Sequence, residues 1–88
     1  KGDWKLDLRV NEQTELEIFA PQNPPERASY PEACGLRHLA FRVTDIEAVV
    51  AELEERGIAC EPIRTDDFTG RKMTFFADPD HLPLELHE

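Results

Sequence analysis

One stretch of the chain has helical periodicity, and its position fixes the order of the elements around it. Four apolar residues recur at i, i+3, i+4 and i+7, the pattern of an amphipathic helix: Ile46, Val49, Val50 and Leu53. Thr44 and Glu47 form a capping box with Thr44 as N-cap, and Gly57 suits the position after the last turn. The sequence therefore predicts a helix over residues 45–56.

Alternating apolar and polar residues, typical of strands, cover most of the remaining chain. The expected strands span residues 4–10, 14–20, 36–43, 59–65, 72–77 and 82–87. A short turn separates the first two, which predicts an antiparallel hairpin with one half-buried apolar face. From residue 36 onward the order is one strand, the helix and three strands, or βαβββ. The expected fold class is α+β.

A proline-rich segment divides the chain. Four prolines lie between residues 21 and 31, and proline neither donates to a strand ladder nor continues a helix. We expect residues 21–34 to form a connecting loop and residues 35–88 to form a complete βαβββ module. Residues 1–20 are expected to be the last strands of a first module of the same kind, truncated because its N-terminal part lies upstream of Lys1.

Charge and cysteine content exclude several classes of protein. The net charge of −9 opposes binding to nucleic acid or to an anionic membrane surface, since both need a basic face. No apolar run approaches the roughly 20 residues of a membrane span. Cys34 and Cys60 are too few for a disulfide framework. One disulfide stays open, but two free thiols in a cytoplasmic protein are the preferred interpretation.

Three predicted strands each place one ligand-type residue on the face opposite their aliphatic side chains: Glu17, His38 and Glu85. Carboxylate oxygens and imidazole nitrogens suit divalent ions such as Zn, Ni, Co or Mn. Spacing alone does not join these residues into one site, and a glutamate on a strand is usually solvated. Both interpretations stay open on the residues alone.

Basic residues near the same strands are candidates for binding an anionic group of a substrate. Arg71 and Lys72 stand at the entry to the strand 72–77, and Arg42 shares a face with His38. A solvated basic pair at a strand start explains Arg71 and Lys72 equally well. His87 shares the face of Glu85 and is expected to support that carboxylate or to be a surface residue.

Short motifs resemble those of the vicinal oxygen chelate superfamily, which includes glyoxalase I, extradiol dioxygenases, fosfomycin-resistance proteins and bleomycin-binding proteins. These motifs are GLRHLAF at the start of the module, DPD before the last strand and LPLEL within it. The segments LEIFAPQNPPER and PEACGLRHLAF are most similar to glyoxalase I-like (lactoylglutathione lyase-like) bacterial proteins.

The resemblance implies two facing βαβββ modules with a divalent metal between their sheets. Matched to the family pattern, Glu17, His38 and Glu85 would be metal ligands, and a fourth ligand would lie upstream of Lys1. The metal would bind two adjacent oxygens of the substrate and stabilise an enediolate as a Lewis acid. Glu85 would be the catalytic residue, because a carboxylate there can move a proton between neighbouring carbons.

For glyoxalase I the implied substrate is the hemithioacetal of an α-ketoaldehyde and glutathione. A second expectation within the superfamily is thiol transfer to an epoxide or ring-cleaving dioxygenation. A third is a metal-free binding protein of the bleomycin-resistance kind, which has no need of three ligand residues. The expected partners are a small-molecule substrate, such as a glutathione or other thiol adduct, and a second copy of the chain in a homodimer.

Overall fold

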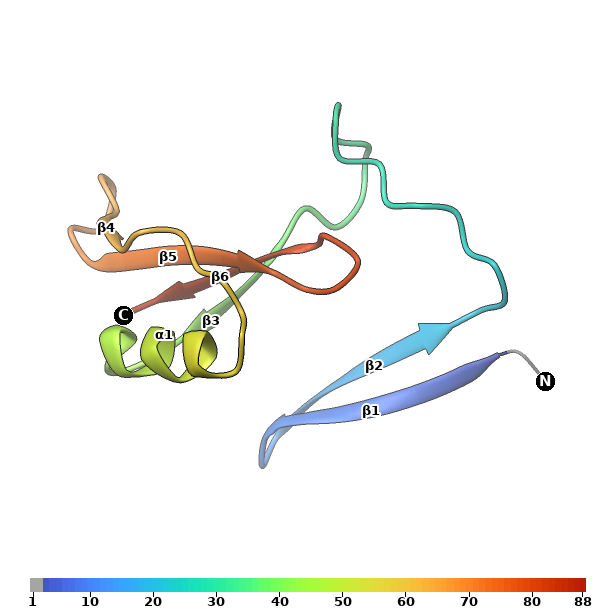
Figure 1. The fold of residues 1–88 in the computed structure, drawn as a ribbon, viewed down its shortest axis with the longest axis horizontal. Helices are drawn as coiled ribbons and strands as arrows, with labels where there is room; N and C mark the ends of the chain where they lie inside the picture. The colour runs from blue at the N-terminus through green and yellow to red at the C-terminus, as the bar shows by residue number, and fades with distance from the viewer. Residues whose placement is uncertain (1–2) are drawn as a thin grey trace.

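The structure is a computed structural model that describes residues 3–88, so the first two residues of the predicted first segment lie outside the described residues. Its elements, in chain order, are β1 (Trp4–Asn11), β2 (Thr14–Ala20), β3 (Leu39–Arg42), α1 (Ile46–Glu55), β4 (Arg64–Thr65), β5 (Lys72–Ala77) and β6 (Pro83–His87). A hairpin, a long loop and a unit of sheet and helix follow one another (Figure 1). The α+β class and the βαβββ order from β3 onward are confirmed.

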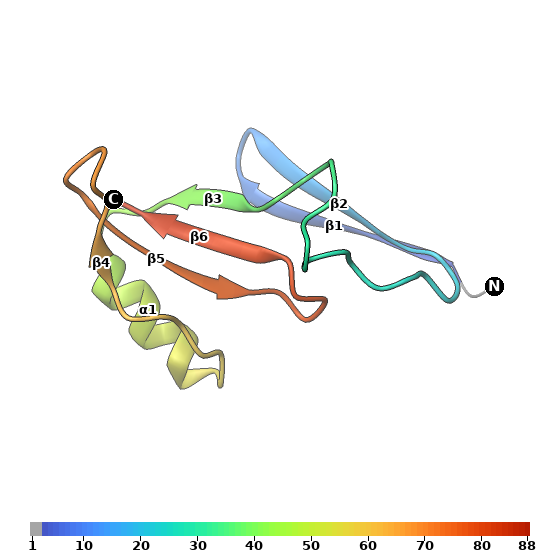
Figure 2. The ribbon, with the colours of Figure 1, turned by 90° about the horizontal axis from the view of Figure 1, so that it is seen from above.

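The hairpin β1–β2 is antiparallel, as predicted, but no layer of the described residues covers its apolar face. The register sets Leu6 opposite Ile18 and Leu8 opposite Leu16, which gathers apolar side chains on one face. Leu6 and Leu8 nevertheless remain 44% and 42% exposed. This face has no cover within residues 3–88 because α1 covers the other sheet and lies away from the hairpin (Figure 2).

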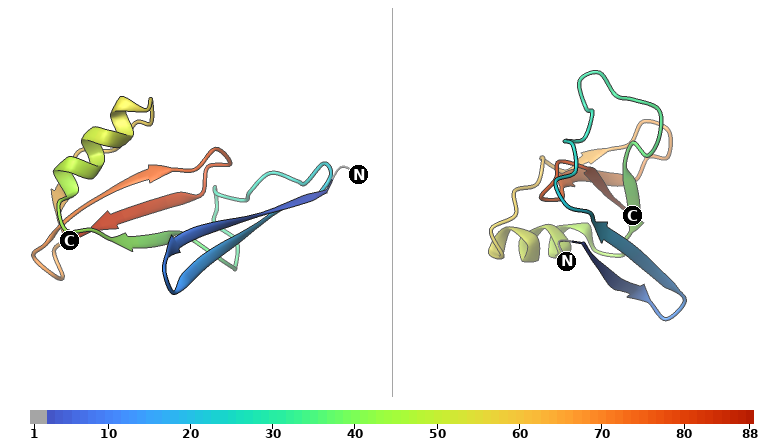
Figure 3. Two further views of the ribbon diagram at one scale, coloured as in Figure 1. Left: turned by 90° about the horizontal axis from the view of Figure 1, so that it is seen from below. Right: turned by 90° about the vertical axis from the view of Figure 1, so that its right-hand side faces the viewer.

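The second sheet has the strand order β3-β6-β5-β4. β3 runs parallel to β6, whereas β5 is antiparallel to both β6 and β4. Helix α1 lies along one face of this sheet (Figure 3). Because side chains alternate along a strand, each strand sends half of its residues toward α1 and half to the opposite side. We call the side away from α1 the open face; it carries Ala40, Arg42, Glu85 and His87.

The core of this unit lies between α1 and the sheet. Ile46, in the first turn of α1, is fully buried, and Leu86 of β6 is 4% exposed. Thr74 of β5 lies opposite Leu86 and is also fully buried. Burial of each large aliphatic side chain contributes about 1.5–3 kcal/mol, so this small core fixes the sheet against the helix and leaves the open face free.

The N-cap of helix α1 lies one residue later than predicted. The N-cap is Asp45, whose Oδ1 accepts a hydrogen bond from the Ala48 N–H at 3.2 Å. The predicted Thr44 cap and its capping box are therefore wrong. Asp and Thr both serve as N-caps, and the Glu47 carboxylate accepts a hydrogen bond from the Lys72 Nζ instead of closing the box.

The C-terminal end of α1 is confirmed. Gly57 has a φ of +84°, a conformation that glycine adopts without steric cost. Its N–H donates to the Glu54 carbonyl at 3.0 Å, and the Ile58 N–H donates to the Leu53 carbonyl at 2.9 Å. This pair of bonds is the Schellman motif, which ends a helix by satisfying its last carbonyls.

Two predicted strands are shorter than expected. Only Arg64–Thr65 of the predicted strand 59–65 pairs in the sheet, because Pro62 interrupts the ladder by lacking an N–H. The preceding segment is held beside β5 by two bonds of Glu61, whose N–H donates to Phe75 and whose carbonyl accepts from Thr74. β3 begins at residue 39, so His38 stands just before the strand.

The proline-rich segment is held together by Arg27. Its Nη1 donates to the Leu36 carbonyl at 3.0 Å, and its Nη2 donates to the Arg37 carbonyl at 3.0 Å and to Glu32 Oε1 at 2.8 Å. One guanidinium thus ties the middle of the loop to the residues that lead into β3. The division of the chain into segments 1–20, 21–34 and 35–88 stays a prediction.

Both cysteines are free, as expected: Cys34 is exposed and Cys60 is partly exposed. Burial raises the pKa of the Cys60 thiol, and the nearby charge of Glu54 raises it further. Within residues 3–88, no helix combines the length and the apolar character needed to cross a bilayer. The cytoplasmic location stays a prediction.

Candidate active site

The open face is centred on Glu85 of β6. The strand register places Ala40 of β3 on one side of Glu85 and Phe75 of β5 on the other. Since Ala40 has a small side chain, it leaves space above the sheet next to the carboxylate. His38 comes two residues before Ala40 and continues the alternation, so it reaches the same face.

The structure brings His38 and Glu85 into direct contact. His38 Nε2 lies 3.1 Å from Glu85 Oε1, and the two side chains are 38% and 14% exposed. The ring of Phe75 meets the imidazole edge-on, with centroids 5.3 Å apart and an interplanar angle of 77°. This aromatic contact orients the imidazole, so the sheet positions a nitrogen and an oxygen donor side by side.

The donor types and the spacing of this pair fit a divalent metal ion. Two ligands about 2.1 Å from one ion, at about 90–110° to each other, lie about 3.0–3.4 Å apart. The 3.1 Å between His38 Nε2 and Glu85 Oε1 falls in that range, and it equally suits a direct hydrogen bond. Metal sites use three or more protein ligands as a rule, so the pair by itself is not a complete set of metal ligands.

Glu17, the third predicted ligand, does not join the pair within one chain. It lies on β2 opposite Asp7, and its carboxylate accepts a hydrogen bond from Lys5 Nζ at 3.3 Å on the polar face of the hairpin. Among residues 3–88, no three His, Cys, Asp or Glu side chains are close enough to hold one ion. Within residues 3–88, His38 and Glu85 therefore lie together on the open face, whereas Glu17 lies apart from them on the hairpin.

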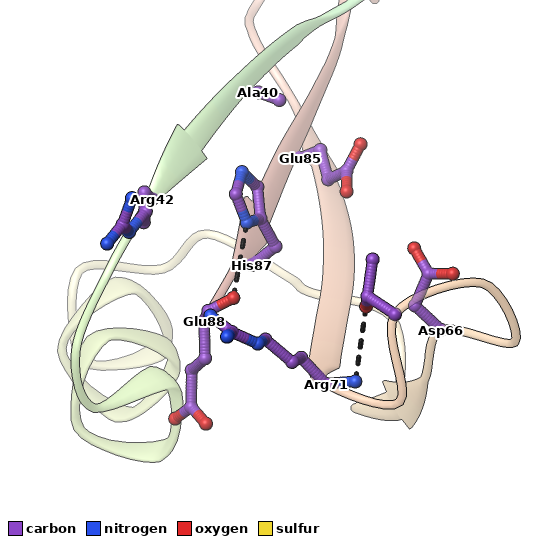
Figure 4. Close-up of a pocket in the computed structure, with 8 residues that line it drawn as sticks. Ala40, Arg42, Asp66, Arg71, Glu85, His87 and Glu88 are labelled. Atoms are coloured by element: carbon purple, nitrogen blue, oxygen red, sulfur yellow. Dashed lines mark hydrogen bonds between the residues drawn. The ribbon is translucent and has the colours of Figure 1, made fainter.

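A cavity of ≈ 480 Å³ adjoins Glu85 on the open face (Figure 4). Two of the predicted substrate-binding residues, Arg42 and Arg71, contribute to its wall from opposite sides of β6. The full lining is Ala40, Arg42, Asp66, Thr69, Arg71, Glu85, His87 and Glu88. The cavity thus combines the candidate catalytic carboxylate with two guanidinium groups.

Lys72, the other predicted substrate-binding residue, points to the opposite side of the sheet. Its Nζ donates to Glu47 Oε2 of α1 at 2.6 Å. This hydrogen bond raises the pKa of Lys72 and lowers the pKa of Glu47. Its place on the helix-covered face follows from strand alternation, since neighbouring residues of a strand face opposite sides.

Several residues of the open face, Ala40 and Glu88 among them, were not predicted as site residues. Phe75 contacts the His38 ring, while Asp66 and Thr69 line the cavity from the turn between β4 and β5. Alternation marks Phe75 as facing away from Thr74, but only the pairing with β6 sets it beside Glu85. His87, which the sequence left between a supporting and a surface role, lines the cavity.

Comparison with known proteins decides the family. The model of the Glyoxalase/Bleomycin resistance protein/Dioxygenase superfamily matches residues 1–86. The chain belongs to this superfamily. It is 57% identical to the protein named "Uncharacterized protein YaeR" of Escherichia coli K12, with 100% of this chain and 68% of YaeR aligned. The Bacillus subtilis 168 protein "Uncharacterized protein YwkD" is 56% identical, over 100% of this chain and 69% of its own length.

A solved glyoxalase-superfamily structure shows the same fold. The glyoxalase family protein from Enterococcus faecalis superposes with a TM-score of 0.91 at 65% identity, covering 98% of this chain and 68% of that one. The resemblance inferred from the motifs is thereby confirmed for the superfamily and for the fold. The names of YaeR and YwkD state no activity, so these relatives indicate neither the reaction, nor the metal, nor a dimer.

Proposed function

We propose that this chain is a metal-dependent lyase or isomerase of the glyoxalase I type that acts on a small oxygenated substrate. The observation that carries the proposal is the contact of His38 Nε2 with Glu85 Oε1 at 3.1 Å, next to a cavity of ≈ 480 Å³. Membership of the superfamily supports it, since the motif resemblance implies that these two residues are metal ligands.

Glu85 is the residue to which we assign the proton transfer. Its Oε1 faces His38, and no hydrogen bond to Oε2 is present within residues 3–88. An oxygen that is free on the cavity side can take a proton from one substrate carbon and return it to the neighbouring carbon. A divalent ion held by His38 and Glu85 would supply Lewis-acid polarisation of the substrate oxygens.

Glu17 of a second copy is our candidate for the missing ligand. Within one chain Glu17 lies on the hairpin and away from the His38–Glu85 pair. A symmetric dimer repeats each contact twice, so an exchange of hairpins between two copies would complete two equal sites. The homodimer is part of this proposal, as is the identity of the ion among Zn, Ni, Co and Mn.

The first test is metal analysis of the purified protein by inductively coupled plasma mass spectrometry. We expect about one divalent ion per chain in the wild type and loss of the ion in His38→Ala. His81→Asn is the matched control, because His81 is exposed, lies outside this cavity and has a positive φ that asparagine tolerates. Absence of bound metal in the wild type, with none lost on His38→Ala, would leave a metal-free binding protein as the function.

The second test is turnover of the hemithioacetal formed from methylglyoxal and glutathione, followed by thioester absorbance with each candidate metal supplied. We expect activity that is lost in Glu85→Gln, since the amide cannot accept the proton. If the protein binds metal but turns over none of this substrate, the glyoxalase I reaction is wrong. Thiol transfer to an epoxide and dioxygenation are then the reactions to assay.

A further inference from the structure

Arg42 and Arg71 are two cations in the cavity without an acidic partner. No ion pair involves either guanidinium within the part of the chain that the structure describes. Arginine presents several donors in a planar fork and stays charged at any relevant pH. Two such groups at one cavity wall therefore have unused capacity to bind an anion.

The carboxylates of the same cavity are already engaged elsewhere. Asp66 Oδ1 accepts a hydrogen bond from the Phe68 N–H at 2.7 Å. Glu88 Oε2 accepts from the Ile46 N–H at 3.0 Å, and its side chain extends toward α1 in Figure 4. Glu85 contacts His38. The positive charge at the wall is thus not cancelled by a direct contact with these acids.

A hydroxyl donor stands next to Arg71. Thr69 Oγ1 accepts a hydrogen bond from the Arg71 N–H at 3.2 Å, which leaves its own O–H free to donate. The turn that carries both residues is closed by two further bonds, from the Asp66 N–H to the Arg71 carbonyl and from the Gly70 N–H to the Asp66 carbonyl, each 2.8 Å. These bonds fix the backbone of the turn from which the Thr69 and Arg71 side chains project.

The strand register sets the distance of these donors from the candidate catalytic group. Arg42 pairs with His87, whereas Ala40 pairs with Glu85. Arg42 therefore lies two residues further along the sheet than Glu85, or about 7 Å at about 3.3 Å per residue. Arg71 precedes β5 at the same end of the sheet, on the far side of β6, and two residues beyond Met73, which pairs with His87. Its backbone is therefore about 13 Å further along the sheet than Glu85.

We propose that Arg42, Arg71 and Thr69 form an oxyanion subsite, so that the substrate carries a carboxylate or phosphate group at the end of the cavity beyond Glu85. The subsite itself follows from the cavity, whereas its assignment to the reacting substrate rests on the proposed function. The substrate class is then an organic acid or phosphate ester, and a neutral molecule of the same size is a poor substrate.

The test is isothermal titration calorimetry on the full chain after removal of metal by chelation. Inorganic phosphate and glutarate are the anionic probes, and glutaramide is the neutral probe of the same shape. We expect Arg42→Gln and Arg71→Gln each to weaken anion binding about tenfold, because each removes charge-assisted hydrogen bonds. Arg71→Lys keeps the charge without the fork and is expected to lose less. The tighter of phosphate and glutarate identifies the anion that the substrate carries.

Arg56→Gln is the matched control, since Arg56 makes only an exposed ion pair with Glu52 on α1 and should leave anion binding unchanged. Equal affinity of wild type, Arg42→Gln and Arg71→Gln would overturn the subsite, as would equal binding of glutarate and glutaramide or no binding of either anion. Metal loading is measured on the same preparations before chelation. If the wild type binds metal but not the anions, this inference alone is wrong. If it binds the anions through Arg42 and Arg71 but holds no metal, the proposed function alone is wrong.

Discussion

Replacing Thr74 with valine tests how the cavity floor is held in place. Thr74 is fully buried, and its Oγ1–H donates to the Glu61 carbonyl at 2.7 Å. Glu61 lies in the irregular segment before β4 and also donates its N–H to Phe75. This bond pair therefore ties the chain that leads to Arg64, whose guanidinium lies 5.7 Å from the Phe75 ring on the open face.

Valine has nearly the shape of threonine but has no hydroxyl. Thr74→Val removes one hydrogen bond and leaves the Glu61 carbonyl without that donor, which costs about 1–3 kcal/mol. For a chain of this size each 1 kcal/mol lowers the melting temperature by about 4–8 °C. Thr74→Ser keeps the hydroxyl and loses one methyl group, which costs about 1 kcal/mol. The expected order of stability is wild type, then serine, then valine.

Urea unfolding at one fixed protein concentration measures this order, since association makes the midpoint depend on concentration. The midpoints should shift without a change in the slope m. Apolar burial by itself would rank valine at or above threonine. If Thr74→Val is as stable as the wild type, the bond to Glu61 contributes nothing and this explanation of the buried hydroxyl is refuted.

Further predictions concern α1 and its contact with β5. Asp45→Ala should lower the free energy of unfolding by about 1 kcal/mol, whereas Thr44→Ala should have almost no effect; thermal unfolding compares them. Gly57→Ala should cost about 1 kcal/mol through its positive φ alone, since a Cβ there meets no atom within 4 Å. Because Lys72 lowers the pKa of Glu47, their contact stabilises the fold above the unfolded pKa of Glu47, and the gain is lost as pH falls through the folded pKa. A pH series of unfolding midpoints should show less acid sensitivity in Lys72→Gln, and an unchanged series would contradict it.

Elements with an uninterrupted local pattern were predictable from the sequence. β5 covers Lys72–Ala77, the predicted range, because its six residues include Thr and two Phe, which favour strands, and no proline or glycine. The position of the helix was predicted correctly because its apolar spacing and Gly57 indicate the same C-terminal end. The N-cap was predicted wrongly, since Thr44 and Asp45 are both good caps and the local sequence does not choose between them.

Elements that depend on partners elsewhere in the chain were predicted less well. The sequence predicted a strand over residues 59–65, but Pro62 lies within it and lacks the N–H that a strand ladder needs. The hairpin pattern was correct, yet its predicted burial needed a covering layer that residues 3–88 do not provide. A local pattern shows which face is apolar, and only the tertiary arrangement shows what covers it.

The candidate site divides in the same way. Alternation placed His38 and Glu85 on comparable faces, but their contact follows from the parallel pairing of β3 with β6 across 47 residues of sequence. Arg71 and Lys72 were predicted together as substrate-binding residues, although successive residues face opposite sides once the strand begins. The structure accordingly places Arg71 at the cavity and Lys72 against α1.

The central claim is that His38 and Glu85 of one copy share a metal ion with Glu17 of another, and mixed dimers test it directly. Glu17→Gln and His38→Ala chains carrying different affinity tags are refolded together, and dimers holding both tags are isolated. If the site is shared, each mixed dimer has one intact set of ligands and should bind about one ion where the wild-type dimer binds about two. Mixed dimers as empty as either variant alone, beside a wild type that binds two ions, would contradict the shared site.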